Sequence, residues 1–288
     1  MSLNPVTKIK MNGPLQGNRI ACITLDLEQD YGDLGYCFNH PTYLGFSILP
    51  NIIEFFEKEN LPMTCFVQGS ILVDYPETID KFTGLDVEFE VHSFSHPTPK
   101  AINHTSEIQR GKESYRNFFG KNPLGYRSPC GFISEEMFSQ LFKQGFQFDS
   151  SVIPSIRPGV YHALTSPVMP YWINPPLMEF PVAVASPILR SPISLSYQKL
   201  LGSPYHLLLQ LISLPQVLIF NFHLHDLVVL PSWKQIPSNP LLKPIMRRMW
   251  GRGDGMRVLG DFVNMLRHKS YKFSKMEQLN ALFREVRP

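Results

Sequence analysis

At residues 91–97 the chain reads Val91-His92-Ser93-Phe94-Ser95-His96-Pro97, which places two histidines four positions apart. They follow an alternating apolar and acidic run at residues 87–91, a pattern that predicts a β-strand ending where the histidines begin. Neutral imidazole is the commonest metal-ligating side chain, and two histidines held at a strand end can share one ion. The stretch therefore indicates part of a metal site at the end of a strand.

A second strand ending is rich in carboxylates. Residues 23–30 read Ile-Thr-Leu-Asp-Leu-Glu-Gln-Asp, an apolar run that passes into acidic side chains. Two histidines need at least one more ligand to make a metal site, and a carboxylate can supply it. Asp26, Glu28 and Asp30 share strand parity, so they face one side if the strand continues through them. The two stretches together predict a two-histidine, one-carboxylate metal site with a spare carboxylate beside it.

The size and composition fit a single strand–helix domain. The chain has 288 residues and a mass of 33.0 kDa, and 43% of its residues are apolar, enough for a sizeable core. Its net charge of +3, with dispersed Lys and Arg, argues against a nucleic-acid partner. We expect a polar lead-in over residues 1–19 and one domain over residues 20–288. The 26 prolines predict long loops, placed at residues 154–176, 185–215 and 231–255.

The cysteines and the apolar runs bear on location. Four cysteines occur without Cys-x-x-Cys spacing: Cys22, Cys37, Cys65 and Cys130. Cys22 and Cys65 lie in apolar runs, which predicts buried free thiols and a reducing compartment. The first twenty residues do not resemble a secretory signal, and the apolar run 207–222 is too short and interrupted to span a bilayer. We therefore expect a cytoplasmic protein, with membrane contact through residues 185–215 as an open alternative.

Strand and helix patterns alternate at least five times, which predicts a parallel sheet. The strands are expected at residues 20–26, 62–67, 87–91, 125–129, 146–149, 178–185 and 217–224. Helices are expected at residues 48–58, 71–82, 106–119, 134–145 and 256–268, and the apolar run 207–222 is expected to begin as a helix and end as a buried strand. Polar residues gather at the carboxyl ends of the strands, the catalytic face of strand–helix barrels: Asp26, His92, Arg127, Asp149 and His223.

These stretches together resemble the polysaccharide deacetylases, the NodB-homology carbohydrate esterases, from about Ile20 to the chain end. Five ordered motifs carry the resemblance: Thr-Leu-Asp-Leu-Glu at 24–28, His-Ser-Phe-Ser-His at 92–96, Arg-Ser-Pro-Cys-Gly at 127–131, Phe-Asp-Ser-Ser at 148–151 and Phe-Asn-Phe-His at 220–223. The family usually has two adjacent aspartates in the first motif. The spaced Asp and Glu found here look like the branch of atypical peptidoglycan deacetylases and allantoinase-like amidohydrolases. The implied fold is α/β, a distorted barrel with seven parallel strands.

The resemblance implies a metal-dependent deacetylase that removes acetyl groups from an N-acetylated sugar or polysaccharide. It assigns Asp26 as general base and Glu28, His92 and His96 as ligands of a divalent ion, zinc being the expected one. Such an ion lowers the pKa of bound water toward ~7, and a nearby carboxylate takes the proton during attack. Asp30 shares the parity of Glu28 and stays an alternative ligand.

Further roles follow from the same resemblance. Arg127 would keep the base ionised, Cys130 would offer a backbone N–H to the oxyanion where the family more often has Tyr, and Asp149 would orient the catalytic histidine. His223 is favoured as general acid because it directly follows the apolar strand, and His225, which precedes an aspartate, is the competing choice. The other histidines match no motif and are expected on the surface or in packing: His40, His104, His162, His206 and His268.

Two other functions compete with the sugar deacetylase. One is a small-amide or cyclic-amide hydrolase on the same scaffold, and the other is a sugar-binding protein without catalysis. The full set of base, ligands and acid argues against the binding protein, because a pure binder would not need Asp26 beside a metal. The shape of the groove separates the two enzymes. An open groove between residues 154–176 and 231–255 suits a polymer, and a closed pocket suits a small amide.

Overall fold

A computed structural model describes residues 7–8, 15, 17–30, 41–98, 103–157, 160–230, 234 and 243–285. Cys37, His40, most of the predicted lead-in, and parts of the loops predicted at 154–176 and 231–255 lie outside the described residues. Within the described ranges, no helix is both long enough and apolar enough to cross a membrane.

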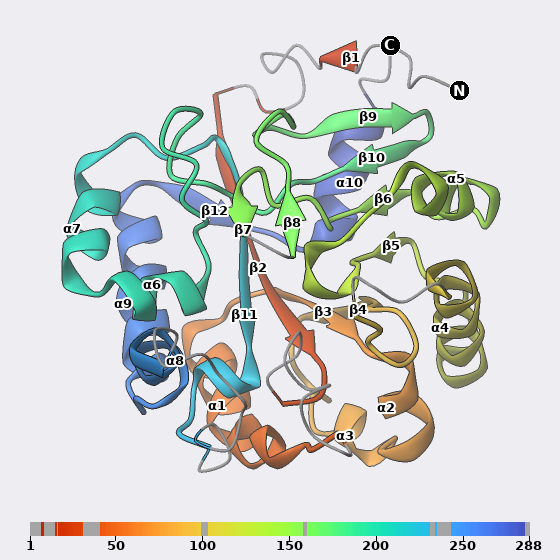
Figure 1. Cartoon of the computed structure of the whole chain (residues 1–288), viewed down its shortest axis with the longest axis horizontal. Helices are drawn as coiled ribbons and strands as arrows, with labels where there is room; N and C mark the ends of the chain where they lie inside the picture. Colours follow the sequence, from red (N-terminus) through yellow and green to blue (C-terminus); the bar gives the residue numbers. More distant parts are fainter. Residues whose placement is uncertain are drawn as a thin grey trace.

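A curled parallel sheet forms the centre of the molecule (Figure 1). Its seven consecutive parallel strands run in the order β10-β6-β5-β4-β3-β2-β11. Their bounds are β2 Arg19–Leu27, β3 Met63–Val67, β4 Val87–Val91, β5 Gly125–Tyr126, β6 Phe148–Asp149, β10 Leu177–Glu179 and β11 Val217–His223. The curled sheet makes a half-barrel, so the predicted α/β fold, a distorted barrel of parallel strands, is confirmed.

Short strands complete the two edges of this sheet. β12 (Tyr271–Phe273) pairs with the first half of β2, while β9 (Tyr171–Asn174) and β1 (Thr7–Lys8) extend the β10 edge in antiparallel fashion. A separate hairpin is formed by β7 (Ile156–Arg157) and β8 (Tyr161–His162). The strand predicted at 178–185 leaves the ladder after Glu179 and turns toward β11, where the Ala183 amide donates to the Ile219 carbonyl at 2.9 Å.

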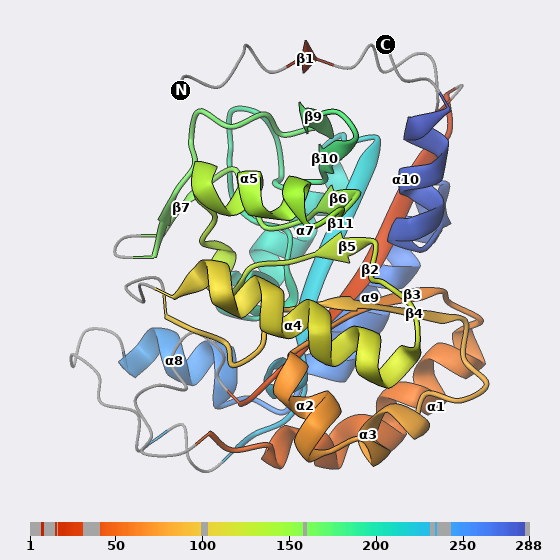
Figure 2. The same ribbon diagram turned by 90° about the vertical axis from the view of Figure 1, so that its right-hand side faces the viewer.

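Helices surround the curled sheet (Figures 1 and 2). The α-helices are α1 Leu49–Glu59, α2 Gly69–Asp74, α3 Glu77–Asp80, α4 His104–Phe119, α5 Glu135–Lys143, α6 Leu195–Leu201, α7 Ser203–Leu211, α8 Lys243–Trp250, α9 Gly255–His268 and α10 Met276–Arg284. Short 3-10 turns are η2 Leu44–Ile48, η3 Pro129–Gly131 and η4 Leu224–Asp226. The single helix predicted at 71–82 is two helices, because Pro76 has no N–H to continue α2.

The apolar run 207–222 divides as predicted into the end of α7 and the buried strand β11. β11 pairs with β2 in a parallel register that sets His223 opposite Asp26. The two residues therefore meet at the same level of the sheet although nearly two hundred positions separate them in the chain. This register is the main contribution of the fold to the site.

Alternation along β2 divides the core in two. Ala21, Ile23 and Leu25 pack outward against the surrounding helices, while Cys22 belongs to a second cluster on the inner face of the curl. Strands buried on both faces are typical of parallel sheets. The Cys22 and Cys65 thiols are buried and free, as predicted, and burial raises the pKa of both thiols well above the usual value.

Candidate metal and catalytic site

The inner face of β2 leads directly into the site. Side chains alternate along a strand, so Thr24 and Asp26 continue the face that begins with Cys22. Glu28 lies just beyond the strand end, and Asp26 and Glu28 are only 4% and 6% exposed. The carboxyl ends of the parallel strands meet at this edge, which brings residues from distant parts of the chain toward these two carboxylates.

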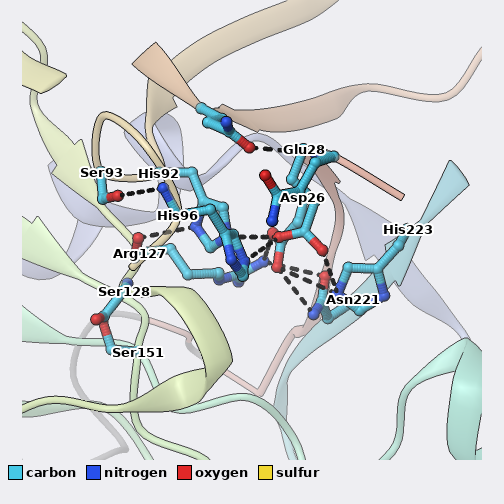
Figure 3. A network of polar contacts seen from close by, with 12 residues as sticks. Asp26, Glu28, His92, Ser93, His96, Arg127, Ser128, Ser151, Asn221 and His223 are labelled. Atoms are coloured by element: carbon cyan, nitrogen blue, oxygen red, sulfur yellow. Dashed lines mark hydrogen bonds and ion pairs between the residues drawn. The ribbon is translucent and has the colours of Figure 1, made fainter. Parts of the chain in front are cut away.

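Glu28, His92 and His96 form one compact cluster (Figure 3). The Glu28 Oε2 atom lies 2.9 Å from His92 Nε2 and 2.7 Å from His96 Nε2. Ser93 and His96 both have left-handed backbone conformations, with φ of 57° and 58°, so the loop after β4 turns back on itself. His92 Nδ1 lies 2.9 Å from the Arg127 carbonyl oxygen, which orients the ring with Nε2 toward Glu28.

Asp30 has a different surrounding from Glu28. Its carboxylate accepts hydrogen bonds from the Thr42 hydroxyl (2.7 Å) and from the backbone amides of Leu44 (2.7 Å) and Gly45 (2.8 Å). These contacts attach Asp30 to the start of η2, and of the two acidic side chains it is Glu28 that faces the histidines. The choice that parity left open is therefore resolved by the turn of the chain after Leu27.

The electrostatic environment of Glu28 favours its ionised form. Burial by itself would raise the pKa of this carboxyl, but the adjacent His96 and His92 hold it well below the usual range. Burial raises the pKa of Asp30, against the effect of its three hydrogen bonds. The pKa values of Glu28 and Asp30 are thus shifted in opposite directions, because only Glu28 faces imidazoles.

Asp26 is held from two sides. Arg127 Nη1 donates to Asp26 Oδ1 at 2.7 Å, and Asn221 Nδ2 donates to Asp26 Oδ2 at 3.1 Å. Arg127 is 2% exposed, stacks over the Phe66 ring at 4.1 Å from its centroid, and donates through Nε to the Ser150 carbonyl at 2.9 Å. The guanidinium is therefore fixed in place, with its charge directly beside the Asp26 carboxylate.

His223 approaches both carboxylates from β11. Its Nε2 atom lies 3.6 Å from Asp26 Oδ2 and 4.0 Å from Glu28 Oε1. On the other side of the ring, Nδ1 lies 2.9 Å from Asp226 Oδ2. Burial lowers the pKa of His223, but the hydrogen bond and the charge of Asp226, with Glu28 and Asp26 nearby, raise it to about 10. The imidazole is oriented with one nitrogen toward the site and the other toward a buried acid.

The role predicted for Asp149 as the partner of the catalytic histidine is wrong. Asp149 accepts hydrogen bonds from Ser151 through its amide (3.1 Å) and hydroxyl (2.6 Å), and Ser151 Oγ accepts from the Ser128 amide at 2.7 Å. Asp226 is the carboxylate beside the histidine, because η4 turns back under the end of β11. Asp149 instead supports the loop that begins at Ser128.

His225 and Cys130 line the same cavity as these residues. The His225 ring stacks on that of His223, with centroids 4.7 Å apart and planes at 10°, and its centroid lies 6.0 Å from that of the Trp250 ring. Cys130 adopts a left-handed conformation, with φ of 60°, inside the turn Pro129–Gly131. Of the two histidines, it is His223 whose Nε2 atom lies within 4.0 Å of the carboxylates of Asp26 and Glu28.

The cavity above this cluster is narrow. It has a volume of about 90 Å³, and its walls include Arg157 and Tyr161 from the β7–β8 hairpin and Trp250 from the end of α8. The predicted loops 154–176 and 231–255 thus both contribute to its walls. Sites for small organic ligands usually measure ~300–1,000 Å³, so this cavity accommodates only a small group.

Two residues of the site were missed in the roles assigned from the sequence. Asn221 precedes His223 by two positions on β11, so strand parity alone could have placed it on the inner face. Asp226 was considered only as the neighbour of His225. Its contact with His223 depends on the tight turn η4, for which the residue pattern contains no signal.

Comparison with known proteins places this geometry in context. Residues 37–148 match the family model described as polysaccharide deacetylase. A peptidoglycan deacetylase of Helicobacter pylori is 28% identical over 108 residues, which make up 36% of this chain and 37% of that protein. The match thus spans little more than a third of the length of this curated relative.

Solved structures match over nearly the whole chain. A Mycobacterium smegmatis protein assigned to the polysaccharide deacetylases has a TM-score of 0.60 at 16% identity, covering 99% of this chain and 96% of that one. PuuE allantoinase also has a TM-score of 0.60, at 13% identity, covering 100% of this chain and 96% of that one. At such identities these superpositions show a common fold. Over residues 37–148 the chain is similar to the polysaccharide deacetylase family.

Proposed function

We propose that this protein is a metal-dependent hydrolase that removes the acetyl group from an N-acetylated carbohydrate. One observation carries the proposal: Glu28 faces two imidazoles at 2.7 and 2.9 Å, while Asp26 and His223 lie on its other side. A ligand set, a carboxylate fixed by Arg127 and an oriented imidazole therefore line one narrow cavity. Metal-assisted amide hydrolysis uses these three components together.

The ligand set fits a divalent ion. The donor atoms of Glu28, His92 and His96 all lie within 4.8 Å of one another, and two imidazoles with one carboxylate are a ligand set that suits zinc. The contact of His92 Nδ1 with the Arg127 carbonyl assigns the proton to Nδ1, so that Nε2 keeps its lone pair for an ion. A divalent ion held here would lower the pKa of a bound water to ~7 and polarise the acetyl carbonyl.

Asp26 would act as the general base. Arg127 and Asn221 orient its carboxylate and leave it beside Glu28, where it can take a proton from the attacking water. Arg127 favours the charged carboxylate, which is the form that accepts a proton. The backbone N–H of Cys130, on the turn that lines the cavity, would donate to the oxygen on which negative charge develops.

His223 would act as the general acid. Asp226 accepts from Nδ1 and keeps the ring protonated, so Nε2 can give a proton to the leaving amine. His223 Nε2 and Asp26 Oδ2 lie 3.6 Å apart, and both residues line the narrow cavity. Acid and base would therefore act on the same amide group bound in that cavity.

The test is acetate release from a panel of N-acetylated sugars of increasing length, including peptidoglycan fragments, with the protein stripped of metal and then reloaded with zinc. We expect release from at least one sugar with zinc and little release without metal. A matched His96→Ala variant should stay inactive under both conditions. Zinc binding without acetate release from any sugar would contradict the proposed activity.

The narrow cavity favours a second candidate, a hydrolase of small or cyclic amides. A volume of about 90 Å³ under Trp250 is small for an internal unit of a polymer. The same panel separates the candidates when simple cyclic amides are added and ring opening is followed. Hydrolysis of cyclic amides in the absence of any acetate release would favour the second candidate.

A further inference from the structure

A second cavity adjoins the narrow one at the metal cluster. It has a volume of about 480 Å³, within the usual range for sites that bind organic ligands. Gly131 and Tyr161 line both cavities, so the two cavities are direct neighbours. A substrate whose acetyl group enters the narrow cavity therefore has an adjacent space for the rest of its bulk.

The lining of this second cavity is mainly hydrocarbon. It includes aromatic and aliphatic side chains from the segment before α5, from α5 itself and from β9, among them Phe132, Ile133, Phe138, Tyr171 and Ile173. None of the described residues that line it is Asp, Glu, Lys or Arg, and its uncharged polar groups come from Tyr161, His162, Thr165, Ser166 and Tyr171. Against the aromatic and aliphatic side chains, sugar hydroxyls would lose hydration, whereas an apolar group would gain by leaving water.

The outer wall of the cavity is held in place by hydrogen bonds. The Ala163 amide donates to the Ser155 carbonyl at 2.9 Å, which fixes the loop after the β7–β8 hairpin. Arg190 Nη1 donates to the Ser166 carbonyl at 2.9 Å and to the Pro154 carbonyl at 3.3 Å. Because the wall is tied to segments outside it, a ligand would enter a largely formed space and lose less free energy in ordering it.

We infer that this cavity, which we call the apolar cavity, binds a hydrocarbon chain or ring carried by the substrate. The substrate class is then an N-acetylated sugar with an apolar substituent rather than an all-polar polymer. The reaction on the acetyl group rests on the proposed function, but the binding of the apolar group does not. The two can therefore fail separately.

The first experiment measures binding without chemistry. Methyl, butyl and hexyl glucosides, which have no acetamide, are titrated into the zinc-loaded protein by calorimetry. Burying each methylene is worth ~0.8 kcal/mol, so Kd should fall about fourfold for each methylene that enters the apolar cavity. The same Kd for all three glucosides would overturn the inference, whether or not the protein releases acetate.

A filling variant locates the binding. Ala163→Phe places a ring in the apolar cavity and should remove the chain-length dependence of Kd, leaving the hexyl compound no tighter than the methyl one. The control is Ala281→Phe, which makes the same change on the exposed face of α10 and should keep the dependence. Ile173→Ala removes bulk from the lining and should weaken binding of the hexyl glucoside while the protein still folds. If both lining variants kept the wild-type affinity for the hexyl glucoside, the hexyl group would bind elsewhere and the inference would be overturned.

A kinetic experiment then connects the cavity to the reaction. Methyl and hexyl glycosides of N-acetylglucosamine are compared as substrates, and the hexyl compound should have the lower KM, with Ala163→Phe removing that advantage. Acetate release with equal KM for both would contradict the inference and leave the proposed function standing. Chain-length-dependent binding without any acetate release would contradict the proposed function alone.

Discussion

His223 Nδ1 lies 2.9 Å from Asp226 Oδ2, within one tight turn that follows the end of β11. This turn is fixed from behind by α6: Ser196 Oγ donates to Asp226 Oδ1 at 2.7 Å, and the buried Lys199 Nζ donates to the Asp226 carbonyl at 2.5 Å. Gly255 packs so close that a Cβ atom there would lie 2.2 Å from that same carbonyl oxygen. The orientation of His223 thus depends on residues about thirty positions away on either side.

The first prediction concerns this pair. Asp226→Asn keeps the shape of the side chain but removes the charge that raises the pKa of His223 to about 10. The pKa of the histidine should therefore fall, and because the acid must be protonated to act, the alkaline limb of the kcat profile should move to lower pH. The measurement is acetate release against pH. An alkaline limb at the wild-type position would show that His223 does not supply the proton. Ser196→Ala should shift the limb in the same direction by less, because Asp226 keeps its charge.

The second prediction separates the base from the ligands. Asp26→Asn should lower turnover by ~10²–10⁴-fold and keep bound zinc, because the amide has the shape of the carboxylate but cannot take the proton. His92→Ala should lose both zinc and activity, since it removes one of the three donor atoms. The checks are metal content by mass spectrometry and acetate release. If Asp26→Asn lost zinc as completely as His92→Ala, Asp26 would be a ligand rather than the base.

The third prediction concerns Asn221, which the motif analysis did not assign. Asn221→Asp replaces the amide that donates to Asp26 Oδ2 at 3.1 Å with a carboxylate, which cannot donate that hydrogen bond. Asn221→Ala should lower kcat by roughly tenfold or more, the usual effect of losing a buried hydrogen bond to a charged group. Asn221→Asp should lower kcat at least as much, because it also places a like charge beside Asp26. Zinc content measured with acetate release is the check, and full turnover in both variants would show that Asn221 does not position the base.

The fourth prediction concerns stability rather than activity. Glu90 is 3% exposed and its Oε2 accepts from the amides of Leu124 (2.9 Å) and Gly125 (2.6 Å). Burial raises its pKa well above the usual value, and these hydrogen bonds only partly oppose that effect. The folded state therefore binds this proton more tightly than the unfolded state does. The stabilisation of the folded state by this proton is fully present below the pKa of Glu90 in the unfolded chain, and it is lost as pH rises through the pKa of Glu90 in the folded protein.

Glu90→Gln should remove the loss of stability that accompanies ionisation of Glu90 at rising pH. One amide oxygen can still accept from both backbone N–H groups, because both reach the same carboxyl oxygen in the native chain. The free energy of unfolding in urea, measured between about pH 5 and 8, should fall less steeply with pH in the variant, by ~1.4 kcal/mol for each unit of pKa shift removed. Glu113→Gln, on the exposed side of α4, is the control and should follow the wild type. Parallel curves for Glu90→Gln and the wild type would rule out Glu90 as the titrating group.

The sequence alone determined the fold class and most of the polar residues of the site. Alternating strands and helices require a parallel sheet, and in such a sheet the carboxyl ends of the strands share an edge. That rule is enough to bring Asp26, His92, Arg127 and His223 toward one place. The pattern also identified α1, α4, α5 and α9, whose apolar residues recur with the helical period.

The tertiary structure decided the contacts that depend on turns and on register. Parity could not distinguish Glu28 from Asp30, because the chain leaves the strand after Leu27 and Asp30 is then bound by the amides of η2. Strand parity also could not reveal the partner of His223. Asp149 lies at a strand end as expected, but its carboxylate accepts from Ser151. The three-residue turn η4 brings Asp226 to His223 instead. Strand patterns report which face a side chain occupies. Which neighbour it then meets is set by packing between segments far apart in the chain, such as β11 on β2 and α6 behind η4, and no local pattern encodes that packing.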